Sequence, residues 1–201
     1  MKPSFLRCTL VVVSILLTLP LGVQAQDVVV LTVQPESRLW VEGTSNKKKD
    51  WKAEAGSLSG QIEIQGSALT PVLTGARFTI PAADLEGDAS MGKFVMQRLM
   101  REALKVNEHP EITYELVSAT PVEDTPNTLR TTGRLTLAGV TREIVMDVAW
   151  EALEGGRFRF TGSHPISMPD YDIDPPSVRT LGYHVGPDVT VHFDLVLGPD
   201  A

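Results

Sequence analysis

The stretch from Ser90 to Lys93 has the residue types and spacing that could supply an activated nucleophile. Ser90-Met91-Gly92-Lys93 matches the Ser-x-x-Lys pattern of certain acyl-transfer enzymes. The Ser-Asp-Asn and Lys-Thr-Gly elements that accompany this pattern in those enzymes are missing from the sequence. A second candidate, Gly56 to Gly60, resembles a serine elbow but has Leu58 at the nucleophile position. The sequence therefore predicts a protein that is not an enzyme; a hydrolase or isomerase would depend on Ser90 and Lys93 alone.

Metal-binding chemistry is not favoured either. The four histidines, His109, His164, His184 and His192, never stand two, three or four residues apart, so no pair is aimed locally at one ion. Asp170, Asp172 and Asp174 imitate the start of a calcium-binding loop. Pro175 takes the place of its obligatory glycine, and Leu181 stands where the bidentate glutamate belongs. We predict no metal site and no cofactor.

The first 25 residues have the pattern of a signal peptide. Lys2 and Arg7 precede an apolar run, Leu10–Leu17, which is too short to span a bilayer as a helix, and small residues lead up to Ala25. The expected organisation is a signal peptide over residues 1–25 and one domain over residues 26–201. The sequence thus predicts a periplasmic or secreted location and no transmembrane helix in the mature chain.

The charge balance argues against nucleic acid as a partner. The whole chain carries a net charge of −7, and removal of Lys2 and Arg7 with the signal peptide makes it −9. Such a surface repels phosphate backbones. The one cysteine, Cys8, lies in the predicted signal peptide, so packing alone must stabilise the domain without disulfides.

Most of the chain has apolar residues at every second position, which is the spacing of β-strands. Turn residues such as Ala138-Gly139 and Gly155-Gly156 separate these runs and predict hairpins. The Pro-rich stretch Pro165–Pro187 is predicted to be a long connection. The alternating runs contain Leu39 and Val41; Ile62 and Ile64; Ala76, Phe78 and Ile80; Ile112, Tyr114 and Leu116; Leu135 and Leu137; Ile144, Met146 and Val148; Phe158 and Phe160; and Val189, Val191, Phe193, Leu195 and Leu197.

One segment, Gly92–Lys105, has helical spacing instead, with Val95, Leu99 and Ala103 on one side. His109-Pro110 follows it, and proline disfavours helical geometry in the residue before it. A single amphipathic helix between many strands favours a mainly β, antiparallel eight-stranded barrel over any parallel α/β fold. Such a barrel either holds one small ligand or is filled by its own side chains.

Four stretches together resemble the YceI family of exported lipid- and polyisoprenoid-binding proteins. They are residues 37–45 (SRLWVEGTS), 108–114 (EHPEITY), 133–142 (GRLTLAGVTR) and 185–191 (VGPDVTV). The resemblance implies a lipocalin-like barrel that encloses an amphiphile with a long apolar tail, and it implies no catalytic residues. Residues 47–51 (KKKDW) depart from the Val-His-Asp-Trp-like sequence that is common in the family.

The leading hypothesis is therefore an exported carrier that holds an isoprenoid or fatty amphiphile inside the barrel, with the helix closing its mouth. A filled barrel that acts as an interaction module of the cell envelope, without a small ligand, is the alternative. An outer-membrane barrel would need aromatic girdles, and aromatic residues make up only 6% of the chain. The sequence leaves the oligomeric state open, a dimer included. The predicted lining residues are Trp40, Phe78, Ile80, Met96, Met100, Tyr114, Phe158 and Phe160.

Overall fold

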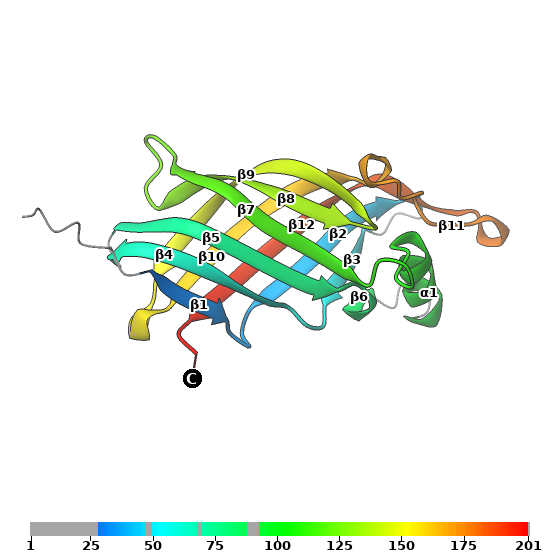
Figure 1. The fold of residues 1–201 in the computed structure, drawn as a ribbon. Coiled ribbons are helices and arrows are strands. Elements are labelled where there is room, and N and C mark those ends of the chain that lie inside the picture. The colour runs from blue at the N-terminus through cyan, green and yellow to red at the C-terminus, as the bar shows by residue number, and fades with distance from the viewer. Residues whose placement is uncertain (1–27, 47–49, 68–69, 88–92, 201) are drawn as a thin grey trace, which may run out of the picture.

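The computed structural model describes residues 28–46, 50–67, 70–87 and 93–200. Strands dominate this part of the chain, and its one α-helix lies at one end of the barrel (Figure 1). The strands are β1 (Val29–Val33), β2 (Arg38–Ser45), β3 (Trp51–Ala55), β4 (Ser59–Ser67), β5 (Thr70–Pro81), β6 (Leu85–Gly87), β7 (Glu111–Pro121), β8 (Thr128–Leu137), β9 (Val140–Ala152), β10 (Phe158–Ser167), β11 (Ser177–Val178) and β12 (Tyr183–Gly198). The helix α1 runs over Lys93–Ala103.

Three strands of the barrel each consist of two consecutive short segments, so that the barrel has eight strands. β1 and β2 follow each other across a bend, as do β3 and β4, and β5 and β6. β1 pairs with β4 while β2 pairs with β3, and β4 pairs with β5 while β3 pairs with β6. With β7, β8, β9, β10 and β12 these pairs make a meander in which every neighbour is antiparallel. This confirms the predicted antiparallel eight-stranded barrel.

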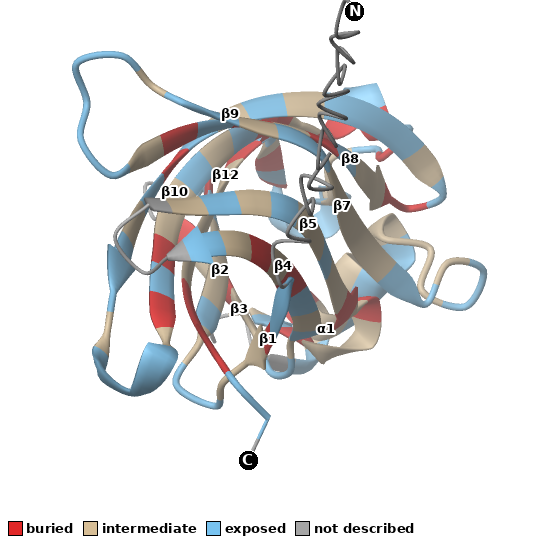
Figure 2. Ribbon diagram, turned by 60° about the vertical axis from the view of Figure 1, so that its left-hand side comes forward, coloured by how far each residue is buried: buried red, intermediate tan, exposed pale blue. Residues whose placement is uncertain are grey.

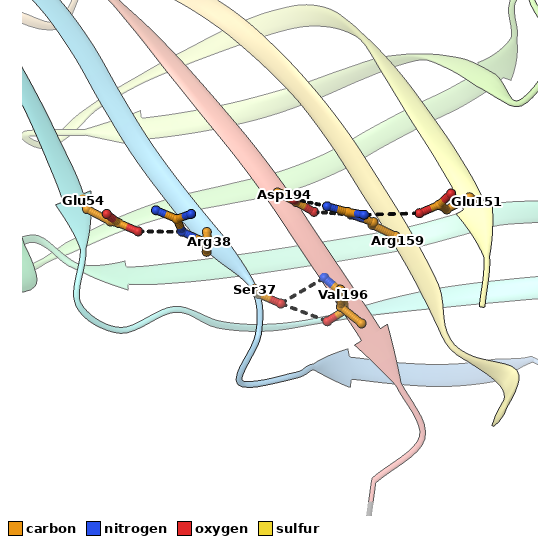
Figure 3. Close-up of polar contacts among 7 residues, drawn as sticks. All are labelled: Ser37, Arg38, Glu54, Glu151, Arg159, Asp194 and Val196. Carbon is orange, nitrogen blue, oxygen red and sulfur yellow. Dashed lines mark hydrogen bonds and ion pairs between the residues drawn. The ribbon is translucent and has the colours of Figure 1, made fainter. Parts of the chain in front are cut away.

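The long strand β12 closes the ring by pairing with both β2 and β1. Val185–Asp194 lie opposite β2, and Leu197 and Gly198 lie opposite Val33 and Thr32 of β1. Between these two regions, residues 34–37 turn away from the ladder. The Ser37 hydroxyl fills the break, because it donates to Val196 O at 3.0 Å and accepts from Val196 N at 3.0 Å (Figure 3). Val196 O also accepts from the backbone N–H of Gln34 at 2.8 Å, so the side chain replaces a missing backbone partner only for the N–H of Val196.

Successive residues on the strands face inward and outward in turn, which appears as alternating buried and exposed bands (Figure 2). The outward face carries charges. Across five strands, Glu151, Arg159, Asp194, Arg38 and Glu54 form a row of alternating sign. Arg159 Nε is 2.6 Å from Asp194 Oδ1, and Arg38 Nε is 2.9 Å from Glu54 Oε1 (Figure 3). These arginines hold the pKa values of Asp194 and Glu54 below the usual range. An outer-membrane barrel has an apolar band on this face instead.

The helix lies between β6 and β7, as predicted, and its described part begins at Lys93 and ends at Ala103 rather than at Lys105. Positive φ at Lys105 (51°) marks the departure from helical geometry. β6 pairs with β3, and α1 packs beside it. Gln97 fixes the helix there, because its Nε2 donates to Leu85 O at 3.0 Å and to Ala83 O at 3.2 Å.

The prediction of one long connection over Pro165–Pro187 is wrong. β10 continues to Ser167 and β12 starts at Tyr183, so the irregular part is shorter and holds two 3₁₀ turns and β11. Pro187 has no N–H to donate to a neighbouring strand. It fits inside β12 because the register with β2 shifts between Val185 and Val189.

We expect Ser37→Ala to destabilise the protein by about 1–3 kcal/mol, because the N–H of buried Val196 would lose its partner. Chemical denaturation would measure the change. Ser118→Ala, at an exposed position on β7, is the matched control and should leave the free energy of unfolding almost unchanged. Equal stability of Ser37→Ala and the wild type would contradict the role given to this hydroxyl.

Candidate functional site

A cavity of about 250 Å³ lies inside the barrel. Two separate groups of buried residues contribute to its wall, one nearer the helix and one at the far end of the barrel. The helix-end cluster consists of Trp51, Ala53, Leu137, Ala138, Ile166, Met168, Tyr171, Ile173, Tyr183, Val185 and Val189. The far-end cluster consists of Leu31, Ile62, Ile64, Val148, Phe158, Phe160, Leu195 and Leu197. The barrel is therefore hollow between two packed regions rather than filled throughout.

Four aromatic rings on the wall lie against glycines of the neighbouring strand. A Cβ added to any of these glycines would come within 2.4–2.6 Å of the ring that covers it. Without a side chain on the glycine, each ring can lie flat along the wall instead of standing across the lumen. The pairs are Gly43 with Trp51, Gly60 with Phe78, Gly133 with Tyr114, and Gly162 with Phe193.

The helix contributes the adaptable part of the wall. Met96, Leu99, Met100 and Ala103 of α1 line the cavity, and Met96 is only 4% exposed. Methionine side chains change shape at little cost and so fit irregular spaces. Gly87 of β6 permits the close approach, because a Cβ there would lie 3.1 Å from Met100 Sδ.

Within the described ranges, the polar side chains of the wall are Thr131, Tyr114 and His164, besides the indole of Trp51. The Trp51 N–H donates to Thr44 O at 3.1 Å. Thr131 is 2% exposed and donates to Met146 O at 3.0 Å. The hydroxyl of Tyr114 is buried against Gly133 and has no hydrogen-bond partner among the described residues. Burial raises the pKa of Tyr114; the nearby Thr131 hydroxyl lowers it by less and does not reach hydrogen-bonding geometry.

His164 is the third polar side chain of the wall. Burial lowers the pKa of its imidazole below the ordinary value, which favours the neutral form at neutral pH. Among the described residues, no Asp, Glu, Lys or Arg lines the cavity. The interior is thus uncharged, and an ion placed there would have no counter-charge to offset its lost hydration.

The structure brings six of the eight predicted lining residues together on the cavity wall: Phe78, Ile80, Met96, Met100, Tyr114 and Phe160. Whether they touch a ligand stays a prediction. Phe158 faces inward but packs at the far end against Trp150 and Phe160, outside the cavity wall.

Trp40, also predicted to line the cavity, lies on the outer surface of the barrel and not on the cavity wall. Its ring stacks on His192 with centroids 5.2 Å apart, and Lys52 Nζ stands 4.7 Å from the ring centroid. The signal for this position was present in the sequence, because Trp40 alternates with Leu39 and Val41 and shares its face with Arg38 and Glu42. Charged neighbours two residues away mark the solvent side of a strand.

Sequence reasoning missed other wall residues, among them Trp51, Met168 and Phe193. Phe193 belongs to one of the alternating runs. Its neighbours His192 and Asp194 are polar and must face the solvent, so Phe193 between them faces inward. Trp51 follows a charged stretch that gave no period-two pattern. Met168 lies on a 3₁₀ turn, where strand periodicity does not apply.

The candidate catalytic serine, Ser90, lies outside the described residues. In the part of the chain that the structure describes, no three His, Cys, Asp or Glu side chains are grouped to hold a metal ion. Asp170 lies on a 3₁₀ turn, and Asp172 follows it with φ of 53°. Within the same ranges, no helix is long and apolar enough to cross a membrane.

The closed meander with a hollow apolar centre places the chain in the class of lipocalin-like barrels. A family model described as the YceI-like domain matches residues 32–197, and the chain belongs to this family. No curated protein gives a significant match.

Solved structures share the fold at low sequence identity. BcnA of Burkholderia cenocepacia is 18% identical with a TM-score of 0.66, over 82% of this chain and 98% of BcnA. A domain from Saccharophagus degradans, described as polyisoprenoid binding, is 16% identical with a TM-score of 0.64, over 87% of this chain and all of that domain. The YceI protein of Campylobacter jejuni is 16% identical with a TM-score of 0.57, over 74% and 85% of the two chains.

We expect Gly133→Ala to destabilise the protein by about 1–3 kcal/mol, because the added Cβ would overlap the Tyr114 ring. The matched experiment is a double-mutant cycle with Tyr114→Ala, measured by denaturant unfolding. In the Tyr114→Ala background the same glycine substitution should cost much less, since the overlapping ring is gone. Equal costs in both backgrounds would show that the ring does not depend on the glycine.

We also expect His164 to make stability depend on pH. Its folded pKa lies below the unfolded value of about 6.5, so the unfolded chain binds the proton more readily. The stability contributed by neutral His164 is complete above about pH 6.5 and is lost as the pH falls through the lowered pKa. Thermal denaturation at about pH 7.5 and about pH 5.5 should give a smaller difference in Tm for His164→Leu than for the wild type.

A matched control is His184→Gln, since His184 is exposed on β12, and it should keep the wild-type difference in Tm. If His164→Leu keeps that difference as well, His164 is not the group that titrates.

Proposed function

We propose that this protein binds one long apolar amphiphile, an isoprenoid or fatty chain, in the cavity of the barrel. The observation that carries the proposal is the uncharged wall, built from aliphatic and aromatic side chains around a space of about 250 Å³. Pockets of this apolar kind bind by burying ligand surface, while a few polar groups provide orientation.

The wall favours the tail of such a ligand over its head. Each buried methylene contributes about 0.8 kcal/mol, so a chain of several isoprene units gains affinity without directional contacts. A phosphate or carboxylate inside the cavity would lose its hydration and meet no cation. We infer that the apolar tail occupies the cavity and that a charged head stays outside it.

The similarity to other proteins agrees with this ligand class. The related domain of Saccharophagus degradans is described as polyisoprenoid binding, and it has the same fold. At 16% identity this supports the general class of ligand but not a specific molecule.

Export and the lack of catalysis are parts of the same proposal. The signal-peptide pattern of residues 1–25 would direct the chain to the periplasm or the medium. There it would hold or carry its ligand without changing it, because among the described residues neither the Thr131 hydroxyl nor the Tyr114 hydroxyl donates to His164, the one imidazole of the wall.

The direct test is to purify the protein from its own host and to identify bound molecules by native mass spectrometry and lipid extraction. In parallel, the ligand-free protein is titrated with geranylgeraniol and with palmitic acid. At about 100 times Kd a ligand contributes about 2.7 kcal/mol, which should raise the Tm by about 5–10 °C. Absence of any bound amphiphile, together with no rise in Tm for either probe, would contradict the proposal and favour the interaction module.

A pair of variants tests whether the ligand binds inside the barrel. Ala76 of β5 lines the cavity, so Ala76→Phe should fill part of it and weaken binding of geranylgeraniol about tenfold or more. Thr79→Phe, outward-facing on the same strand, is the control and should bind as the wild type does. Equal binding by both variants would place the ligand elsewhere.

A further inference from the structure

The outer side of α1 combines a highly exposed aromatic side chain with basic residues. Phe94 is 92% exposed, the highest value among the exposed large apolar side chains of the described chain. Arg98 and Arg101 on the same helix are also exposed. The spacing of four and three residues from Phe94 through Arg98 to Arg101 follows the helical repeat, and Lys105 comes just after the helix ends at Ala103. We call Arg98, Arg101 and Lys105 the basic stripe; with Phe94 they border one shallow hollow of the surface.

The sign of the charge on the basic stripe is opposite to that of the whole chain. Three cations stand along it, while the chain carries a net charge of −7. Two carboxylates border the same hollow. Glu102 is paired with Arg98 at 3.7 Å, and Glu108 lies after the helix. The residues that border the hollow therefore carry a net charge of +1, from three cations and two carboxylates, and Phe94 lies at the edge of the hollow.

A side chain as large and apolar as Phe94 gains free energy only when another apolar phase covers it. A helix with basic residues on its outer side and an exposed aromatic beside them has the composition of helices that lie in a membrane interface. The cations meet anionic headgroups, and the ring enters the acyl boundary. Charge complementarity thus favours an anionic bilayer over a neutral one.

The position of the basic stripe connects it to the cavity. The inner side of the same helix, through Met96, Leu99 and Met100, forms part of the cavity wall. Gln97 attaches the helix to Ala83 of η1 (Ala82–Asp84) and to Leu85, the first residue of β6. A bilayer in contact with its outer side would lie one helix diameter, about 10 Å, from the cavity.

We propose that the outer side of α1 docks on the surface of an anionic phospholipid bilayer, with Phe94 inserted among the lipids and the basic stripe on their headgroups. The surface would bring the cavity next to the membrane from which an apolar ligand is taken or to which it is delivered. This purpose rests on the proposed function, but the docking itself does not.

The test is sedimentation of the full mature chain with sucrose-loaded vesicles, one set of phosphatidylcholine alone and one of phosphatidylcholine with phosphatidylglycerol. The wild type should bind the anionic vesicles and bind them less at about 1 M salt, where screening is strong. Phe94→Ser should lower the partition coefficient about tenfold or more. The matched control is Val145→Ser, which removes an apolar side chain that is 53% exposed on the outer face of β9.

The charge contribution has its own pair of variants. Arg98→Ser with Arg101→Ser should weaken binding to the anionic vesicles, whereas Arg130→Ser with Arg134→Ser removes the same charge from β8 and should not. Equal binding to both vesicle types, or wild-type binding by Phe94→Ser, would overturn the proposal. On the same variants, binding of geranylgeraniol is measured from the shift in Tm in the absence of vesicles. A protein that docks but binds no probe would contradict the proposed function alone.

Discussion

Closure of the barrel by β12 is the constraint on which the interior depends. This strand is sixteen residues long and pairs with two successive segments of the same barrel strand, so the wall has no free edge between them. The bend at residues 34–37 would interrupt the closure. There the Gln34 N–H donates to Val196 O, and the Ser37 hydroxyl accepts from the Val196 N–H, which has no backbone partner across the bend. Once the ring is closed, every inward side chain competes for one enclosed volume.

The size of the open volume follows from where the large side chains go. The rings of Trp51, Phe78, Tyr114 and Phe193 lie over glycines and so occupy the wall rather than the centre. The two buried clusters then pack the ends, and the middle stays open. The flexible methionines of α1 complete the boundary at one end. A rigid wall and an adaptable end suit a ligand that is defined by its apolar surface.

Periodicity predicted the strands, the single helix and the barrel, because alternation along a strand is a local property of the sequence. It did not predict which face of each strand points inward. For Trp40 the charged residues on the same face, Arg38 and Glu42, indicate the outer side of the strand. The pairing of glycines with rings could not be predicted, since it depends on the register between strands that are apart in sequence. The start of β12 was missed because the Pro-rich stretch up to Pro187 has little apolar periodicity, although a register shift accommodates Pro187 within the strand.

The glycine and aromatic pairs have a consequence for how such a protein can diverge. A larger residue in place of the glycine displaces the ring, and a smaller residue in place of the ring leaves a gap over the glycine. Either change alone is costly, while a joint change keeps the wall continuous and alters the bore of the barrel. Evolutionary drift at these sites should therefore proceed by correlated replacement, and a comparison of related sequences would reveal it as covariation between positions on adjacent strands.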